Sequence, residues 1–219
     1  MTPDVWVVWP TVNVEKSWDM ITVWHKGGYS VAILVNPPFQ HTDLSEADRV
    51  IVQQEWKGFP IAANILCREA PGDVVAVVGD DVYPEPKKTA QEIGQDFLQR
   101  FPDLFGVMQP TGDIYGCINQ CAVSPWIGRK FIQEAYGGKG PYWEEYFHYF
   151  SDQELQEHAI KMKAFQQCPD ISQYHDHWGR QKEVKRPKHL RKAKQLWQKD
   201  KTLFEHRKAA GFPSCPSPA

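Results

Sequence analysis

The sequence contains neither a C-x-x-C motif nor a long apolar segment. The cysteines are odd in number and lack zinc-ligand spacing, so we expect no disulfide framework, no structural zinc site and mostly reduced cysteines in the core. The apolar run at residues 5–9 ends at Pro10, too early for a signal peptide or a membrane span. We therefore expect a cytoplasmic protein with no transmembrane segment. The five cysteines are Cys67, Cys117, Cys121, Cys168 and Cys215.

Two glycine-rich phosphate-binding motifs are also missing. The sequence has no G-x-x-x-x-G-K-[ST] motif, and the segment after the first expected strand holds Pro10 and Thr11 instead of a glycine-rich turn. These absences argue against a P-loop nucleotide site and against a dinucleotide site of the Rossmann type. They also disfavour a nucleotidyltransferase, which usually has a glycine-rich basic loop at this position.

Positive charge is scarce over most of the chain and concentrated near its end. Between Arg180 and Lys208 there are twelve Lys or Arg and three acidic residues, a net charge of +9. Because the whole chain carries −2, residues 1–179 carry −11. A basic tail on an acidic body predicts attraction to a polyanion, either nucleic acid or an anionic membrane surface.

What the sequence does contain is a regular alternation of strand and helix patterns. Strands are expected at residues 5–9, 31–35, 74–78 and 104–108. Helices are expected at 14–26, 61–69, 87–100 and 124–135. Two more helices are expected to begin at Ser45, with Val50, Ile51 and Trp56 as apolar positions, and at Ser151. This order predicts an α/β fold with a mostly parallel central sheet and helices on both faces. We expect a single catalytic domain at 1–179, followed by a basic amphipathic helical extension at 180–219.

Two adjacent carboxylates follow the most apolar of the expected strands. Residues 74–78 are Val-Val-Ala-Val-Val, typical of a central parallel strand, and Asp80 and Asp81 come directly after Gly79. Ligands of open α/β sheets bind outside the carboxyl ends of such strands, and a divalent cation held by carboxylates can bind a diphosphate. The alternative is that the pair only opens a turn before Pro84 and Pro86.

Four segments in order make the chain resemble the glycosyltransferase-A fold, in particular small family-two-like sugar transferases. They span roughly residues 5–160 and lie at residues 9–13, at 63–64 with 70–73, at 78–84, and at 144–145 with 151–155. The resemblance implies a single glycosyltransferase-A-like domain that binds a nucleotide-sugar donor with Mn²⁺ or Mg²⁺. The chain departs from the family pattern at Gly79 and Asn36, where the family often has acidic residues, and this leaves the nucleotide preference open.

The resemblance also implies roles for individual residues. Pro10 and Thr11 would border the base and ribose, with Asn64 lining the same pocket. Asp80 would take part in nucleotide binding, and Asp81 would be the more direct metal ligand.

Two histidines near the end of the catalytic domain are further candidate metal ligands. On an extended segment His175 and His177 project the same way, and some transferases of this fold complete the metal site with a C-terminal histidine. We place His177 ahead of His175 as a ligand. The alternative is a surface loop beside a packing tryptophan.

Asp152 is the expected general base. In inverting sugar transfer a carboxylate takes the proton of the acceptor hydroxyl, and Asp152 stands at a predicted helix start. The alternative is an aspartate that only stabilises the first helical turn. Glu144 and Glu145 are the fallback bases.

The basic tail suggests what the acceptor is. Some bacteriophages glycosylate hydroxymethylated pyrimidines of their DNA with small enzymes of this fold, so we expect a DNA acceptor bound through the tail, in the host cytoplasm if the protein is phage-encoded. One alternative is a transferase for cell-envelope saccharides, docked on anionic lipid by the amphipathic helix. Another is a non-catalytic nucleic-acid-binding module on the same scaffold, which would leave the acidic pair and the histidines unexplained.

Overall fold

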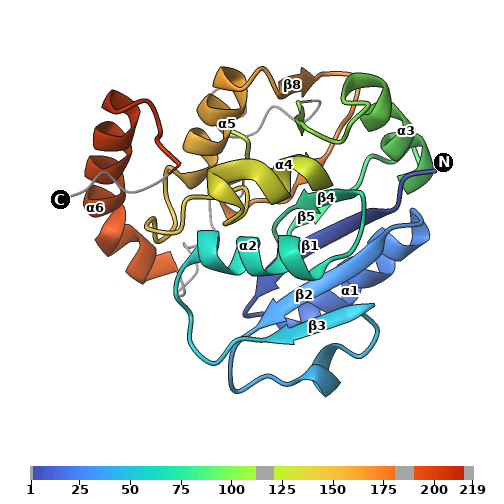
Figure 1. Cartoon of the computed structure of the whole chain (residues 1–219). Coiled ribbons are helices and arrows are strands. Elements are labelled where there is room, and N and C mark those ends of the chain that lie inside the picture. Colours follow the sequence, from blue (N-terminus) through green and yellow to red (C-terminus); the bar gives the residue numbers. More distant parts are fainter. Residues whose placement is uncertain (1, 112–120, 181–189, 215–219) are drawn as a thin grey trace.

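A seven-stranded sheet forms the centre of the molecule (Figure 1). The structure, a computed structural model, describes residues 2–111, 121–180 and 190–214. The strand order within these residues is β3-β2-β1-β4-β7-β6-β8. The strands are β1 (Val5–Thr11), β2 (Ser30–Val35), β3 (Arg49–Val52), β4 (Val74–Val77), β6 (Val107–Pro110), β7 (Trp126–Gly128) and β8 (Phe165–Cys168).

Most neighbouring strands of the sheet are parallel. The strands β3, β2, β1 and β4 pair in parallel, as do β6 and β8, whereas β7 is antiparallel to both β4 and β6. The strands β1, β4 and β6 therefore end at the same edge of the sheet, and β7 begins there. We call this the carboxyl edge. It is the edge at which open α/β sheets bind their ligands.

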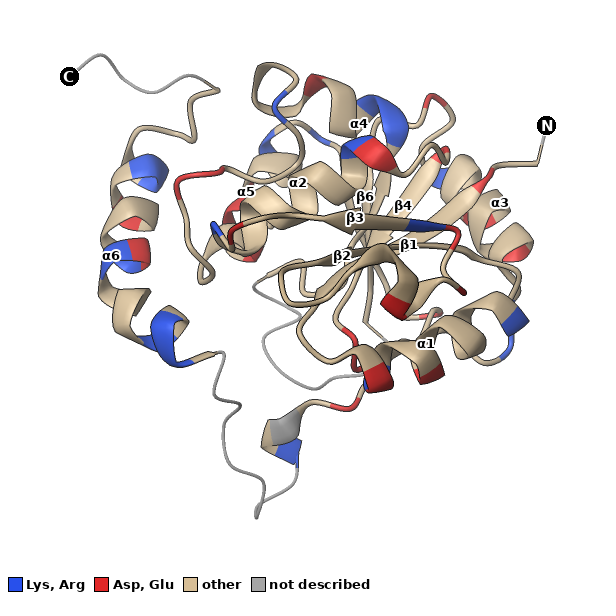
Figure 2. Ribbon diagram, turned by 90° about the horizontal axis from the view of Figure 1, so that it is seen from below, with Lys and Arg blue, Asp and Glu red and all other residues tan. Residues whose placement is uncertain are grey.

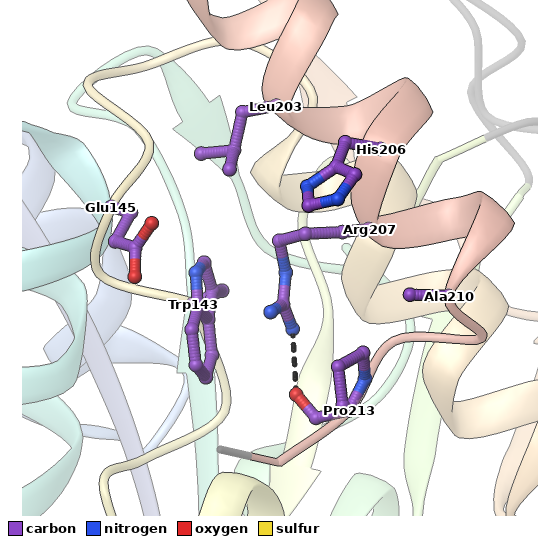
Figure 3. Close-up of a pocket in the computed structure, with 7 residues that line it drawn as sticks. All are labelled: Trp143, Glu145, Leu203, His206, Arg207, Ala210 and Pro213. Atoms are coloured by element: carbon purple, nitrogen blue, oxygen red, sulfur yellow. Dashed lines mark hydrogen bonds between the residues drawn. The ribbon is translucent and has the colours of Figure 1, made fainter. Parts of the chain in front are cut away.

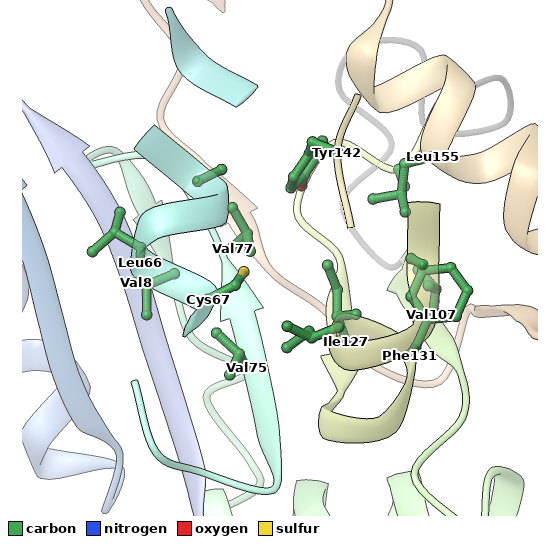
Figure 4. Close-up of a cluster of buried hydrophobic side chains, with 14 of the residues drawn as sticks. Val8, Leu66, Cys67, Val75, Val77, Val107, Ile127, Phe131, Tyr142 and Leu155 are labelled. Carbon is green, nitrogen blue, oxygen red and sulfur yellow. The ribbon is translucent and has the colours of Figure 1, made fainter. Parts of the chain in front are cut away.

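Helices cover both faces of the sheet, which confirms the predicted α/β architecture. The helices α1 (Val14–Lys26) and α3 (Ala90–Arg100) contribute to one cluster of buried side chains. The helices α2 (Phe59–Glu69), α4 (Arg129–Glu134) and α5 (Ser151–Lys161) contribute to the other. Figure 4 shows part of this second cluster, in which Leu66 and Cys67 of α2 lie over Val8 and Val75 of the sheet.

Strand β1 shows why the central strands are apolar on both sides. Its residues alternate between the two clusters, with Val7 and Trp9 in one and Val8 in the other, and all three side chains are completely buried. Complete burial of a Val side chain contributes roughly 1.5–3 kcal/mol to folding. Because a parallel strand between two helical layers is buried on both faces, its sequence is an unbroken apolar run.

Two of the predicted helices are wrong in type or extent. The segment after Ser45 forms the edge strand β3, because the β-branched residues 50–52 pair with β2. The predicted helix at 124–135 begins only at Arg129, since residues 126–128 form β7. Gly128 ends this strand where no side chain fits: a Cβ atom there would lie 2.1 Å from the carbonyl oxygen of Leu104.

The predicted C-terminal helix is present as α6 (Leu190–Ala209) and packs against α5. Within the described residues no helix is both long and apolar enough to cross a membrane. The division into residues 1–179 and 180–219 stays a prediction, because it falls next to the undescribed residues 181–189.

The cysteines only partly follow the expectation of reduced core residues. Cys67 and Cys168 are free and buried, but Cys121 is disulfide-bonded. Cys117 and Cys215 lie outside the described residues.

Candidate active site

Two of the predicted nucleotide-binding residues meet at the carboxyl edge. Thr11 is the last residue of β1, and its Oγ1 donates a hydrogen bond of 2.9 Å to Oδ2 of Asp80, which follows β4. The same Oγ1 accepts a hydrogen bond of 2.9 Å from the backbone N–H of Asn13, the residue that caps α1. Pro10 is half-buried next to Thr11. The ends of two adjacent parallel strands thus bring hydroxyl and carboxylate oxygens together.

Asp81, the second residue of the acidic pair, contacts His175, which lies 94 residues later in the sequence. Two short strands, β5 (Val82–Tyr83) and β9 (Tyr174–His175), form an antiparallel ribbon in which Val82 pairs with His175. The backbone N–H of Asp176 donates a hydrogen bond of 2.7 Å to the carbonyl oxygen of Asp81. This ribbon places Nε2 of His175 3.2 Å from Oδ1 of Asp81.

The contact between Asp81 and His175 keeps the carboxyl group of Asp81 ionised. Burial alone would raise the pKa of the carboxyl group, but the hydrogen bond and charge of His175, with further positive charge from Lys16 and His177, lower it below its usual value. A carboxylate that stays charged at neutral pH while partly removed from water is suited to binding a cation.

The geometry of Asp81 and His175 fits two neighbouring ligands of one divalent ion. With bonds of about 2.1 Å and near-octahedral angles, adjacent ligand atoms lie about 3 Å apart, close to the observed 3.2 Å. Among the described residues no group of three or more His, Cys, Asp or Glu side chains could hold a metal.

His177 is less well arranged as a ligand than His175. Its Nδ1 accepts a hydrogen bond of 3.0 Å from the backbone N–H of Gly179. This hydrogen bond occupies the lone pair that Nδ1 would offer to a metal. The structure thus brings His175 against Asp81, whereas the order of the two histidines as metal ligands stays a prediction.

Asp152 lies at the same edge of the sheet, in the first turn of α5. Its carbonyl oxygen accepts a hydrogen bond of 3.2 Å from Ala122, which precedes β7 at the carboxyl edge. Burial raises the pKa of its carboxyl group to about 6, although backbone N–H groups, including that of Gln153 at 3.0 Å, act in the opposite direction. A carboxyl group with this pKa can accept a proton near neutral pH.

Asn64 is fully buried, and its amide is bound within the protein. It accepts a hydrogen bond of 3.0 Å from the N–H of Tyr142 and donates one of 2.8 Å to the carbonyl oxygen of the same residue. It also donates a hydrogen bond of 3.1 Å to Oε1 of Glu144, which lies 3.7 Å from Arg68. Asn64 therefore holds the loop that carries the fallback bases, and its contact with a nucleotide stays a prediction.

The second fallback base, Glu145, lines a cavity between this loop and α6 (Figure 3). Arg207, which also lines this cavity, forms a buried ion pair that the sequence did not predict. Glu154, two residues after Asp152, is bound by Arg207 of α6 with distances of 2.7–3.1 Å. Nothing local in the sequence distinguishes Glu154 from the other acidic residues of a helix start.

Several solved structures are similar to this fold. No protein-family model and no curated protein sequence matches the chain. It is similar to the mannosyltransferase PcManGT from Pyrobaculum calidifontis in complex with GDP-Man and Mn²⁺, with 14% identity, a TM-score of 0.55, and coverage of 76% of this chain and 54% of that chain. It is similar to a fragment of S. aureus TarS in complex with UDP, with 14% identity, a TM-score of 0.56, and coverage of 78% and 59%.

A longer S. aureus TarS structure matches with a TM-score of 0.57 and 14% identity over 78% of this chain, but only 36% of that chain. The chain thus spans little more than half the length of the first two structures that it matches. At this identity the likeness concerns the fold. The chain therefore has a mostly parallel α/β fold like that of PcManGT and TarS.

Proposed function

We propose that this protein is a metal-dependent glycosyltransferase, which moves a sugar from a nucleotide-sugar donor to a hydroxyl group of an acceptor. One observation carries the proposal: two polar contacts lie together at the carboxyl edge of the mostly parallel sheet. They join Thr11 to Asp80, and Asp81 to His175. Support comes from the mannosyltransferase of the same fold, whose structure contains GDP-Man and Mn²⁺.

These contacts support a donor site at the carboxyl edge. Pro10, Thr11 and Asp80 border the nucleotide, and Asn64 supports the neighbouring wall by holding Tyr142. Asp81 and His175 would hold Mn²⁺ or Mg²⁺, with His177 as an additional ligand only if its ring reorients. When bound, the ion would offset the negative charge of the diphosphate leaving group.

The proposed reaction is an inverting displacement with Asp152 as the base. The acceptor oxygen forms a bond to the anomeric carbon while the bond from that carbon to the diphosphate breaks. The proton of the acceptor hydroxyl passes to the carboxylate of Asp152, and the nucleoside diphosphate leaves with the bonding electrons. The raised pKa of Asp152, about 6, suits this proton transfer near neutral pH.

For the acceptor, we propose hydroxymethylated pyrimidine bases of DNA. The support is the charge of α6, along which Lys and Arg residues recur (Figure 2). The side chains of several of them are exposed. The same helix leaves Trp197 40% exposed beside Lys201, a combination that also suits the surface of an anionic membrane. A cell-envelope saccharide is therefore the second candidate acceptor.

Calorimetry with UDP and GDP tests the donor site. Binding of one of them in the presence of Mn²⁺, lost in EDTA, is the expected result, because two carboxylates cannot attract a diphosphate without a cation between them. Asp81→Ala should weaken this binding at least about tenfold. As a matched control, Asp19→Ala removes an exposed carboxylate of α1 and should leave the affinity unchanged. Equal affinity in Mn²⁺ and EDTA would refute the metal site.

A further inference from the structure

The inner face of α6 carries two buried charged residues. Asp200 is 1% exposed and Arg207 is 4% exposed, and their spacing of seven residues places them on the same face of the helix. Burial of a charge is unfavourable unless hydrogen bonds and counter-charges satisfy it. The partners of these two side chains therefore indicate what the helix is attached to.

Asp200 binds the backbone of the loop that leads into α5. Its Oδ1 accepts a hydrogen bond of 3.0 Å from the N–H of Phe147, and its Oδ2 accepts hydrogen bonds of 3.0 Å from the N–H groups of His148 and Tyr149. One carboxylate thus fixes three consecutive peptide groups. Asp152 follows three residues later.

Phe150, the residue between this loop and α5, is also held by α6. Its backbone is left-handed, with φ of 67°, a conformation that residues other than glycine rarely adopt. Its ring stacks on Phe204 at 5.4 Å between ring centroids and contacts Trp197 at 5.7 Å. The two aromatic residues of α6 therefore stabilise the turn at which α5 begins.

Arg207 holds the chain on the other side of Asp152. Its guanidinium donates hydrogen bonds to both carboxylate oxygens of Glu154, which is fully buried and also accepts hydrogen bonds from the hydroxyls of Tyr136 at 2.8 Å and Tyr146 at 2.7 Å. The guanidinium lies 3.5 Å from the centre of the Trp143 ring and donates a hydrogen bond of 3.1 Å to Pro213 (Figure 3).

We propose that Asp200 and Arg207 are positioning residues for Asp152, so that α6 sets the place and the environment of the catalytic base. Asp200 fixes the peptide groups just before Asp152, and Arg207 fixes the carboxylate two residues after it. The role of these two residues in catalysis rests on the proposed transferase function. The contacts of α6 on both sides of Asp152 are independent of that function.

Three variants test the proposal. Asp200→Asn removes the charge and turns an N–H donor towards the loop. The double variant Glu154→Gln/Arg207→Met removes both buried charges together, so that neither remains unpaired and the fold is retained. Lys208→Gln is the matched control, because it removes a surface ion pair of 2.6 Å between the same two helices, with Glu157. Circular dichroism and thermal unfolding establish that each variant is folded.

Two measurements separate positioning from packing. The first is kcat and KM for hydrolysis of UDP-glucose and GDP-mannose: we expect kcat to fall at least about tenfold in the first two variants, while KM and the Mn²⁺-dependent affinity for UDP and GDP stay unchanged. The second is the pKa of Asp152 from ¹³C-carboxyl NMR. The pKa of Asp152 should fall from about 6 towards the ordinary 3.8, because water reaches the loosened turn. Tyr142 is a titratable group near Asp152. Lys208→Gln should change neither quantity.

The outcomes distinguish this proposal from the transferase assignment. If folded Asp200→Asn and the double variant keep the wild-type kcat and the wild-type pKa of Asp152, α6 only packs on the body and the proposal is overturned. If the wild-type protein neither binds nucleotides nor hydrolyses the donors, the transferase proposal fails. The NMR measurement then still decides whether α6 sets the environment of Asp152.

Discussion

The carboxylate of Asp81 occupies the space beside Gly79: a Cβ atom at residue 79 would lie 2.5 Å from Oδ1 of Asp81. This is the oxygen that faces His175 at 3.2 Å. Gly79 stands where the resembling family often has an acidic residue, and here the absence of a side chain allows Asp81 to meet His175.

Gly79→Ala should therefore weaken metal binding without unfolding the protein. The new methyl group would displace the end of a movable side chain rather than the backbone, so we expect the free energy of unfolding to change by less than about 1 kcal/mol. The Mn²⁺-dependent affinity for a nucleoside diphosphate should fall by roughly tenfold, as measured by calorimetry. An unchanged affinity would show that this oxygen takes no part in the site.

The parts of the fold that were predictable are those with a local signal. The strand at 74–78, with Asp80 and Asp81 after it, marked both the centre of the sheet and the edge that carries the site. Strand β7 was missed because it has only three residues, 126–128, and its partners β4 and β6 are remote in sequence. Its apolar residues fit a buried helix as well as a strand.

Residues of the candidate site were predicted individually where the chain resembles a motif of the family. The resemblance indicated Asp81 and His175 separately, but their contact depends on the pairing of β5 with β9. The ion pair of Glu154 and Arg207 joins residues 53 positions apart, and a buried Glu in a first helical turn looks the same in sequence as an exposed one. Tertiary packing, rather than any local pattern, decides such contacts.

His175→Ala and His177→Ala should differ in their effect on metal binding. Because His175 faces Asp81 and His177 accepts a hydrogen bond from Gly179, loss of the first ring should weaken Mn²⁺-dependent nucleotide binding about tenfold or more, and loss of the second only slightly. Titration with MnCl₂ at fixed UDP or GDP measures both. A larger loss in His177→Ala would mean that its ring reorients towards the metal.

Asp152→Asn should abolish most turnover and leave donor binding intact. The amide has the same shape as the carboxyl group but cannot take the acceptor proton, so kcat should fall by about 10² or more while the affinity for the donor stays within about twofold. In the wild type, kcat/KM should rise with pH through about 6, where Asp152 loses its proton, and then level off. Survival of the rate in the variant would leave Asp152 with a structural role only.

The same substitution should stabilise the fold at neutral pH. The pKa of Asp152 is about 6 in the folded protein and 3.8 as its ordinary value, so between these pH values the folded state keeps a proton that the unfolded state loses. Stability therefore decreases as the pH rises through this window, by about 1–3 kcal/mol. Asp152→Asn should raise the free energy of unfolding at pH 8 and change it much less at pH 4, as urea denaturation can show. Equal effects at both pH values would contradict the raised pKa.

The acceptor is tested best by changing the outer face of α6 and leaving its inner face intact, since removal of the helix would strip Glu154 of its buried partner. Arg191, Lys194 and Lys199 are exposed on α6, and their combined replacement by Gln should weaken duplex DNA binding. If each contacts one phosphate, the slope of log affinity against log salt should fall by about 3.

The matched control for this experiment replaces three exposed lysines of the body, Lys26, Lys57 and Lys87, by Gln, and should leave DNA binding unchanged. Flotation with phosphatidylserine vesicles distinguishes the membrane alternative, in which the exposed part of Trp197 would insert at the lipid surface. Clear flotation without salt-dependent DNA binding would replace DNA by an envelope saccharide as the acceptor. The proposed donor site would be unaffected by that result, because its proposed metal ligands Asp81 and His175 do not lie on α6.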